Sequence, residues 1–209
     1  MASTRTRSDS SDTQPRDSEG RFRSKSAFFG GQTGALVGAA VAGAAVGLAA
    51  NFGRKMLMQS PAFVSGNWDD ALKTEHKMTL ALFDQLEATG DDATGTRAGL
   101  VMKIKYALSK HALQEENVIY PVLREANEAH DADELNGEHG YVKTYLYELE
   151  NMAKDSPDFL PRVREFRSLL EGHIRNEEDV VFPRLRATLS EEQNRKITLA
   201  MNKEGLKLA

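Results

Sequence analysis

Two stretches of the sequence decide the fold: HALQEENVIYPVLR at 111–124 and HIRNEEDVVFPRLR at 173–186. They align without gaps, 62 residues apart, on the pattern H-x-x-x-E-E-[ND]-V-[IV]-[YF]-P-x-L-R. Two earlier stretches, EHKMTLALFDQLE at 75–87 and EHGYVKTYLYELE at 138–150, align at an offset of 63 residues. The chain therefore contains two copies of one helical hairpin.

The sequence around these stretches is helical in character. From about residue 67 onward no strand-like alternation appears, and Gly and Pro fall between segments or near their ends. Ser190 and Gln193 offer a capping box for a last helix. The predicted helices are 66–89, 96–126, 132–154 and 158–187, with a shorter fifth at 190–206. Four long helices with short connections predict an all-α, up-down-up-down four-helix bundle made from a duplicated αα-hairpin.

Histidine and glutamate interrupt the apolar stripe of the second and fourth helices. In each H-x-x-x-E the two side chains lie one turn apart on the same face, His111 with Glu115 and His173 with Glu177. An unpaired ionised carboxylate is costly to bury, so two of them inside one bundle need positive charge between them. Metal ions supply that charge, and a nitrogen and oxygen ligand set without sulfur suits a di-iron centre.

The repeat extends this ligand set to both hairpins. Four of the five histidines stand at equivalent places, 35 residues apart in the first half and 34 in the second. The candidate metal ligands are His76, His111 and Glu115 from one hairpin, and His139, His173 and Glu177 from its copy. We expect two iron ions, bridged by the two carboxylates and an oxo or hydroxo group, with at least one open position. Dioxygen, another small diatomic molecule such as nitric oxide, or a peroxide is the expected ligand there.

At these residues the sequence resembles the hemerythrin family in its bacterial HHE cation-binding form. The resemblance covers about 70–187 and rests on the candidate ligands and on the Tyr-Pro or Phe-Pro pair that follows each H-x-x-x-E. It implies a left-handed four-helix bundle whose non-haem di-iron site binds dioxygen reversibly. Relatives in this family serve in oxygen carriage, in oxygen or iron sensing, and in repair of damaged iron centres.

One position departs from the family pattern. Oxygen-carrying hemerythrins have a fifth terminal histidine where this chain has Leu135. A water, Glu116, Glu178 or a displaced His130 could fill that place, or it could stay open. Metal binding is therefore a firmer expectation than reversible oxygen carriage.

Several other residues have plain structural expectations. Tyr120 and Phe182 are expected to pack in the core, and the prolines after them to bend or loosen their helices. Trp68 is expected to pack near the start of the first helix. His130 is expected to lie in a loop.

The first third of the chain has a different composition. Residues 1–26 are rich in Ser, Arg and Asp, which predicts a disordered tail. Residues 27–53 carry no charge and contain two GxxxG pairs, which fits a membrane-inserted helix or hairpin, a soluble Gly/Ala helix for self-association, or a cleaved signal peptide. Residues 54–65 are a predicted linker to a domain at 66–209. Location in the cytoplasm or at the inner membrane is favoured.

Composition narrows the function classes. The chain has no cysteine, which excludes disulfides, zinc–thiolate sites, iron–sulfur clusters and thiol nucleophiles. Its net charge of -4 predicts no nucleic-acid partner. The leading hypothesis is a non-catalytic di-iron protein that binds or senses dioxygen, related oxidants or iron. The alternatives are a di-iron enzyme acting on peroxide or nitric oxide, an iron donor for repair, and a membrane-tethered interaction protein.

Overall fold

The computed structural model describes residues 66–208 of the chain. The predictions for 1–26, 27–53 and 54–65 therefore lie outside the described residues. Within the described part all regular structure is helical, and none of its helices is long and apolar enough to cross a membrane.

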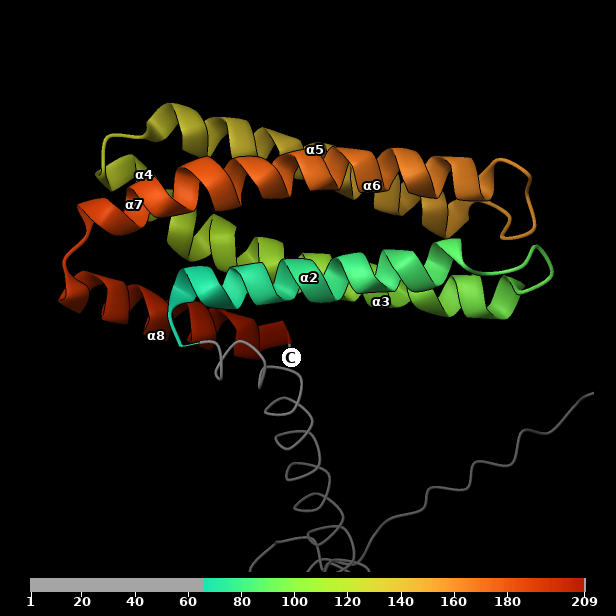
Figure 1. Cartoon of the computed structure of the whole chain (residues 1–209), viewed down its shortest axis with the longest axis horizontal. Helices are drawn as coiled ribbons and strands as arrows, with labels where there is room; N and C mark the ends of the chain where they lie inside the picture. The colour runs from blue at the N-terminus through green and yellow to red at the C-terminus, as the bar shows by residue number, and fades with distance from the viewer. Residues whose placement is uncertain (1–65, 209) are drawn as a thin grey trace, which may run out of the picture. The chain divides into compact units, whose positions relative to one another are not determined.

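Four helical rods lie side by side, and consecutive rods run in opposite directions (Figure 1). The first rod is α2 (Trp68–Glu87) and the third is α5 (Ala129–Asn151). The second rod consists of α3 (Thr94–Gln114), η1 (Glu115–Ile119) and α4 (Tyr120–Glu125). The fourth consists of α6 (Phe159–Asn176), η2 (Glu177–Val181) and α7 (Phe182–Thr188). The predicted all-α bundle is confirmed.

The second and fourth rods differ from the continuous α-helices predicted at 96–126 and 158–187. Each contains one five-residue π-helical turn, η1 or η2, immediately before its Tyr-Pro or Phe-Pro pair. The backbone N–H of Tyr120 donates to the carbonyl of Glu115, and that of Phe182 donates to the carbonyl of Glu177. Proline has no N–H and its ring clashes with the carbonyl four residues back, so a wider turn upstream accommodates it. The sequence predicted loosened helices at the two prolines, and the structure shows this loosening as π turns that begin at the candidate ligands Glu115 and Glu177.

The buried apolar residues form two clusters at different levels of the bundle. One cluster packs around Trp68, Tyr120 and Phe182, and the other around Phe83 and Phe166. Along every rod, the residues between the two clusters include a candidate histidine or glutamate ligand. The bundle therefore holds one buried polar layer between two apolar layers, which isolates the polar groups from water.

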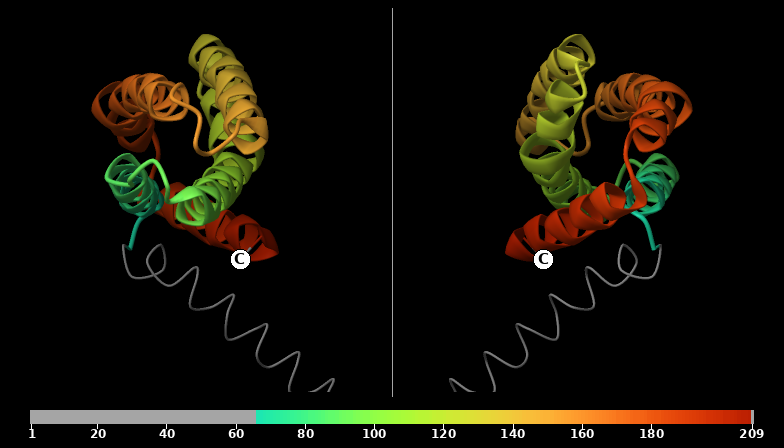
Figure 2. Two further views of the ribbon diagram at one scale, coloured as in Figure 1. Left: turned by 90° about the vertical axis from the view of Figure 1, so that its right-hand side faces the viewer. Right: turned by 90° about the vertical axis from the view of Figure 1, so that its left-hand side faces the viewer.

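A fifth helix, α8 (Glu191–Leu208), packs on the outside of the four rods against α2, α3 and η1 (Figure 2). The predicted capping box is confirmed, because the N–H of Ser190 donates to the Gln193 side chain and the N–H of Gln193 donates to the Ser190 hydroxyl. The helix has 18 residues and is shorter than each of the four rods, as predicted. The indole N–H of buried Trp68 donates to Asn194 at 2.9 Å and ties α2 to α8.

Candidate metal centre

The polar layer brings together all six residues that the sequence singled out as metal ligands, and all six are buried. Two groups of side chains have ligand atoms within 4.8 Å of one another. One group is His76, His111, Glu115 and Glu177; the other is Glu115, His139 and His173. Glu115 belongs to both, so the two positions that can hold a cation are adjacent and share a carboxylate.

The two glutamates lie between histidines of different rods. Glu115 Oε1 lies 3.2 Å from His111 Nε2, while its Oε2 lies 3.4 Å from His139 Nε2. Glu177 Oε2 lies 3.4 Å from His76 Nε2 and 3.3 Å from His173 Nε2. Each carboxylate thus faces one histidine of each hairpin. Glu115 does so through two different oxygens, a placement that would suit a carboxylate between two metal ions, whereas Glu177 does so through one oxygen.

Several atoms of this layer are buried without a hydrogen-bond partner. They are both carboxylate oxygens of Glu115, Oε2 of Glu177 and Nε2 of His173. A buried polar group left without a partner costs about 1–3 kcal/mol, so a cluster of four at one place is not a stable arrangement by itself. All four are lone-pair donors of the kinds that bind iron, which means that the residues present fit a metal pair.

Every candidate histidine uses its other ring nitrogen for a carboxylate. His76 Nδ1 lies 2.8 Å from Glu178 and His139 Nδ1 lies 3.0 Å from Glu116, both across the two hairpins. His111 Nδ1 lies 3.3 Å from Glu75 and His173 Nδ1 lies 2.6 Å from Glu138, both within one hairpin. A carboxylate only accepts, so Nδ1 carries a proton in each ring and Nε2 faces the centre; His76 Nε2 and His111 Nε2 lie 2.9 Å apart, so one of them donates to the other until metal binding releases its proton.

These four outer carboxylates follow the same repeat as the ligands. From the sequence, Glu116 and Glu178 were expected to be solvated or to support the ligands, with a ligand position as the alternative, and no role was expected for Glu75 or Glu138. The signal was present in the aligned pairs Glu-His at 75–76 and 138–139 and in the doubled glutamate after each H-x-x-x. Successive side chains of an α-helix point about 100° apart around its axis. A glutamate next to a ligand in sequence therefore points toward a neighbouring helix, and its partner is a histidine on another rod.

The charges of the layer support one another. Burial disfavours ionisation of Glu115, but the positive charge of His111 and the nearby His139 imidazole outweigh it and hold the pKa of Glu115 well below its usual value. Burial also lowers the pKa of His111, yet Glu115 and Glu75 reverse this effect and raise it well above its usual value. A cation can replace the protons of these histidines as the partner of the buried carboxylates.

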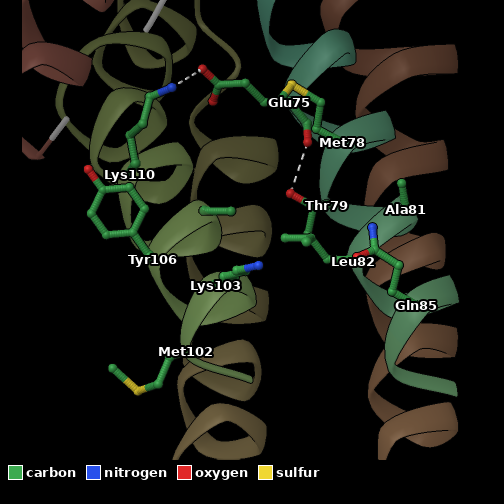
Figure 3. Close-up of a pocket in the computed structure, with 11 residues that line it drawn as sticks. Glu75, Met78, Thr79, Ala81, Leu82, Gln85, Met102, Lys103, Tyr106 and Lys110 are labelled. Atoms are coloured by element: carbon green, nitrogen blue, oxygen red, sulfur yellow. Dashed lines mark hydrogen bonds and ion pairs between the residues drawn. The ribbon is translucent and has the colours of Figure 1, made fainter. Parts of the chain in front are cut away.

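One outer carboxylate has an additional partner. Lys110 Nζ donates to Glu75 at 2.7 Å, and both side chains are almost fully buried. The equivalent position of the second hairpin is Gly172, so the repeat is asymmetric here. This ion pair closes one end of a groove of about 680 Å³ between α2 and α3, lined further along by Met78, Leu82 and other side chains (Figure 3). None of the six candidate ligands lines the groove.

The remaining positions named by the sequence have clear locations. Leu135 lies fully buried in the apolar cluster around Trp68. His130 lies in the first turn of α5 and not in a loop, and its side chain is 86% exposed, which leaves it outside the centre. Tyr120 is buried as expected, but its hydroxyl also reaches the polar layer, 3.1 Å from His139 Nε2 and 3.4 Å from Glu177 Oε1.

Comparison with known proteins agrees with this geometry. The chain is 30% identical over 128 residues to a protein of Nostoc sp. named DNA nickase, a match that covers 61% of this chain and 36% of that protein. It is 29% identical over 130 residues to an uncharacterized hemerythrin-like protein of Schizosaccharomyces pombe, covering 60% of this chain and 62% of the relative. No solved structure matches. Residues 69–185 match the profile described as the hemerythrin HHE cation binding domain, and the chain belongs to this family.

Proposed function

We propose that this domain binds two iron ions through His76, His111, Glu115, His139, His173 and Glu177, and that it binds or senses dioxygen or a related oxidant. Glu115 and Glu177 bridge the two ions, together with an oxo or hydroxo group. The iron pair supplies redox-active binding of a small oxidant. A role in sensing iron itself rests on the same site.

One observation carries the proposal. The two oxygens of Glu115 face histidines of different hairpins at 3.2 and 3.4 Å, and neither oxygen has a hydrogen-bond partner. The two oxygens therefore face two separate cation positions, one toward each histidine. A pair of cations uses both, and it also offsets the cost of burying the carboxylate.

The protein side chains have three tasks in this function. The Nδ1 contacts of the histidines to glutamates hold each imidazole in the tautomer and orientation that present Nε2 to iron. The apolar clusters on both sides keep bulk water from the layer. Leu135 supplies no nitrogen at the place of a fifth histidine, which leaves coordination capacity for an external ligand.

The experiment is iron loading of the full-length protein, with metal analysis and optical spectra recorded with and without oxygen. We expect about two irons per chain and ligand-to-metal absorption bands that change when oxygen is admitted. His111→Ala and Glu177→Ala should lose most of the iron, whereas His130→Ala, which removes an exposed histidine, should retain it. A folded protein that binds no iron would refute the proposal.

An enzymatic function has one specific observation in its favour. Leu135 stands at the fifth-histidine place and supplies no ligand atom, so the metal pair would have coordination capacity for a substrate. The substrates would be peroxide or nitric oxide, and iron donation for repair would use the same opening. Turnover by the iron-loaded protein no faster than by free iron would reject this alternative.

Two partner predictions also stay as proposals. Tethering or self-association through 27–53 would be tested by fractionating the full chain beside a variant beginning at residue 60. We also infer no nucleic-acid partner, from the net charge of -4. The relative named DNA nickase makes this worth measuring, although the match spans 36% of that protein. Supercoiled plasmid incubated with iron-loaded protein should be relaxed no faster than with the Glu177→Ala variant.

A further inference from the structure

The two hairpins are nearly equivalent around the centre, with one chemical difference on its inner side. The position after η1 is Tyr120, and the equivalent position after η2 is Phe182. Both side chains are buried, with 2% and 0% exposure. The chain therefore places one phenol oxygen against the metal layer on one side, and a plain benzene ring on the other.

The π turn is what brings this oxygen to the centre. In an α-helix, Tyr120 would lie about 140° around the axis from Glu115, because five residues advance by 100° each. In η1 the N–H of Tyr120 donates to the carbonyl of Glu115, five residues back, which places the two residues close to one line along the rod. The tyrosine then follows its glutamate into the layer.

The hydroxyl of Tyr120 contacts the atoms that face the metal. It lies 3.1 Å from His139 Nε2, which is the lone-pair nitrogen because Nδ1 of the same ring is engaged with Glu116. It lies 3.4 Å from Glu177 Oε1, a long contact for a hydroxyl donating to a carboxylate. Phe182 stacks near His76, with ring centroids 6.3 Å apart, and brings no polar atom to that side.

We propose that the phenol oxygen of Tyr120 is a seventh protein ligand, bound to the iron held by Glu115, His139 and His173. The proposal rests on the iron site proposed above. Binding breaks the phenol O–H bond and forms an iron–oxygen bond, and the proton is released to the buffer, as it is from other acidic ligands. The two irons are then inequivalent, because only one of them has a phenolate ligand.

The test is resonance Raman and visible absorption spectroscopy of the full-length protein loaded with ferric iron. Iron(III) phenolates have a visible charge-transfer transition that enhances tyrosine ring vibrations. We expect these bands in the wild type and their loss in Tyr120→Phe, with iron content unchanged because the six other ligands remain. Tyr145→Phe should keep the bands, since Tyr145 stacks on Phe166 away from the layer. The double variant Tyr120→Phe with Phe182→Tyr should regain a phenolate band from the other side.

The outcomes separate this inference from the function on which it rests. A wild type that binds no iron refutes the di-iron proposal itself. A wild type with about two irons and no phenolate bands overturns the role of Tyr120 alone, and this result needs no variant to fold. Phenolate bands that persist in Tyr120→Phe would likewise overturn it.

Discussion

Replacing Glu177 by glutamine should stabilise the metal-free protein and destabilise the iron-loaded one. In the metal-free state, Glu177 Oε2 and His173 Nε2 are buried 3.3 Å apart, and neither has a hydrogen-bond partner. The amide of glutamine can donate to Nε2 of a neutral His173 imidazole, which a carboxylate cannot do. One hydrogen bond then satisfies two atoms, and one buried negative charge disappears from the layer.

The size of the effect follows from those atoms. An unsatisfied buried polar group costs about 1–3 kcal/mol, so the metal-free Glu177→Gln variant should gain about 1–3 kcal/mol in its free energy of unfolding. For a domain of this size, each kcal/mol corresponds to a rise of roughly 2–4 °C in Tm. In the wild type, each of the two iron sites adds about 2.7 kcal/mol when free iron is at a hundred times its Kd, and the variant largely forgoes both contributions. The order of stability should therefore reverse on loading.

The assay is thermal unfolding of both proteins by calorimetry, with and without iron, at pH 8. Asp179→Asn is the matched control, since it removes an exposed charge from the same π turn and should change the free energy of unfolding by no more than about 0.5 kcal/mol. A metal-free Glu177→Gln variant less stable than the wild type would refute the reasoning. So would an iron-loaded variant as stable as the loaded wild type.

Three further predictions concern the surroundings of the centre. Glu138→Ala removes the 2.6 Å partner of His173 Nδ1 and should weaken iron affinity by about 10–100-fold, measured by chelator competition, while the domain stays folded. Burial lowers the pKa values of His139 and His173, but neighbouring carboxylates outweigh this effect and raise both above 6.5. The stability that the two histidines contribute to the metal-free protein is complete below pH 6.5 and is lost as the pH rises through the raised pKa values. Iron affinity rises over the same range, so urea unfolding with and without iron should show opposite slopes of stability against pH. Asn194→Ala leaves the buried indole N–H of Trp68 unpaired and should lower the free energy of unfolding by about 1–3 kcal/mol in urea titrations, and no change would mean that water replaces the contact.

Much of the site could be predicted from spacing alone, because that part is local. His111 and Glu115 share a helix face by the period of the α-helix, and the structure keeps their side chains 3.2 Å apart. The internal repeat then identified the equivalent ligands of the second hairpin, His139, His173 and Glu177, without any knowledge of the tertiary fold. The Ser190 and Gln193 capping box was equally local, since it spans a single helical turn.

The contacts between rods were beyond this kind of reasoning. Glu178 meets His76, which is 102 residues away, and Glu116 meets His139, 23 residues away. Helical periodicity defines the direction of a side chain on its own rod, whereas the relative height and rotation of two rods depend on how their apolar clusters pack. A glutamate one position past a ligand was therefore open to a solvated or a supporting role.

Within the described residues, the sequence by itself determined the helices, the duplicated hairpin and the six histidines and glutamates at matching positions. The tertiary structure decided which carboxylate orients which imidazole, where α8 covers the bundle, and the direction of Tyr120. Tyr120 shows the reason most clearly. A π turn shifts every following side chain by one residue in register, so although the proline after Tyr120 favours a loosened turn, regular helical periodicity does not place the tyrosine hydroxyl in the layer.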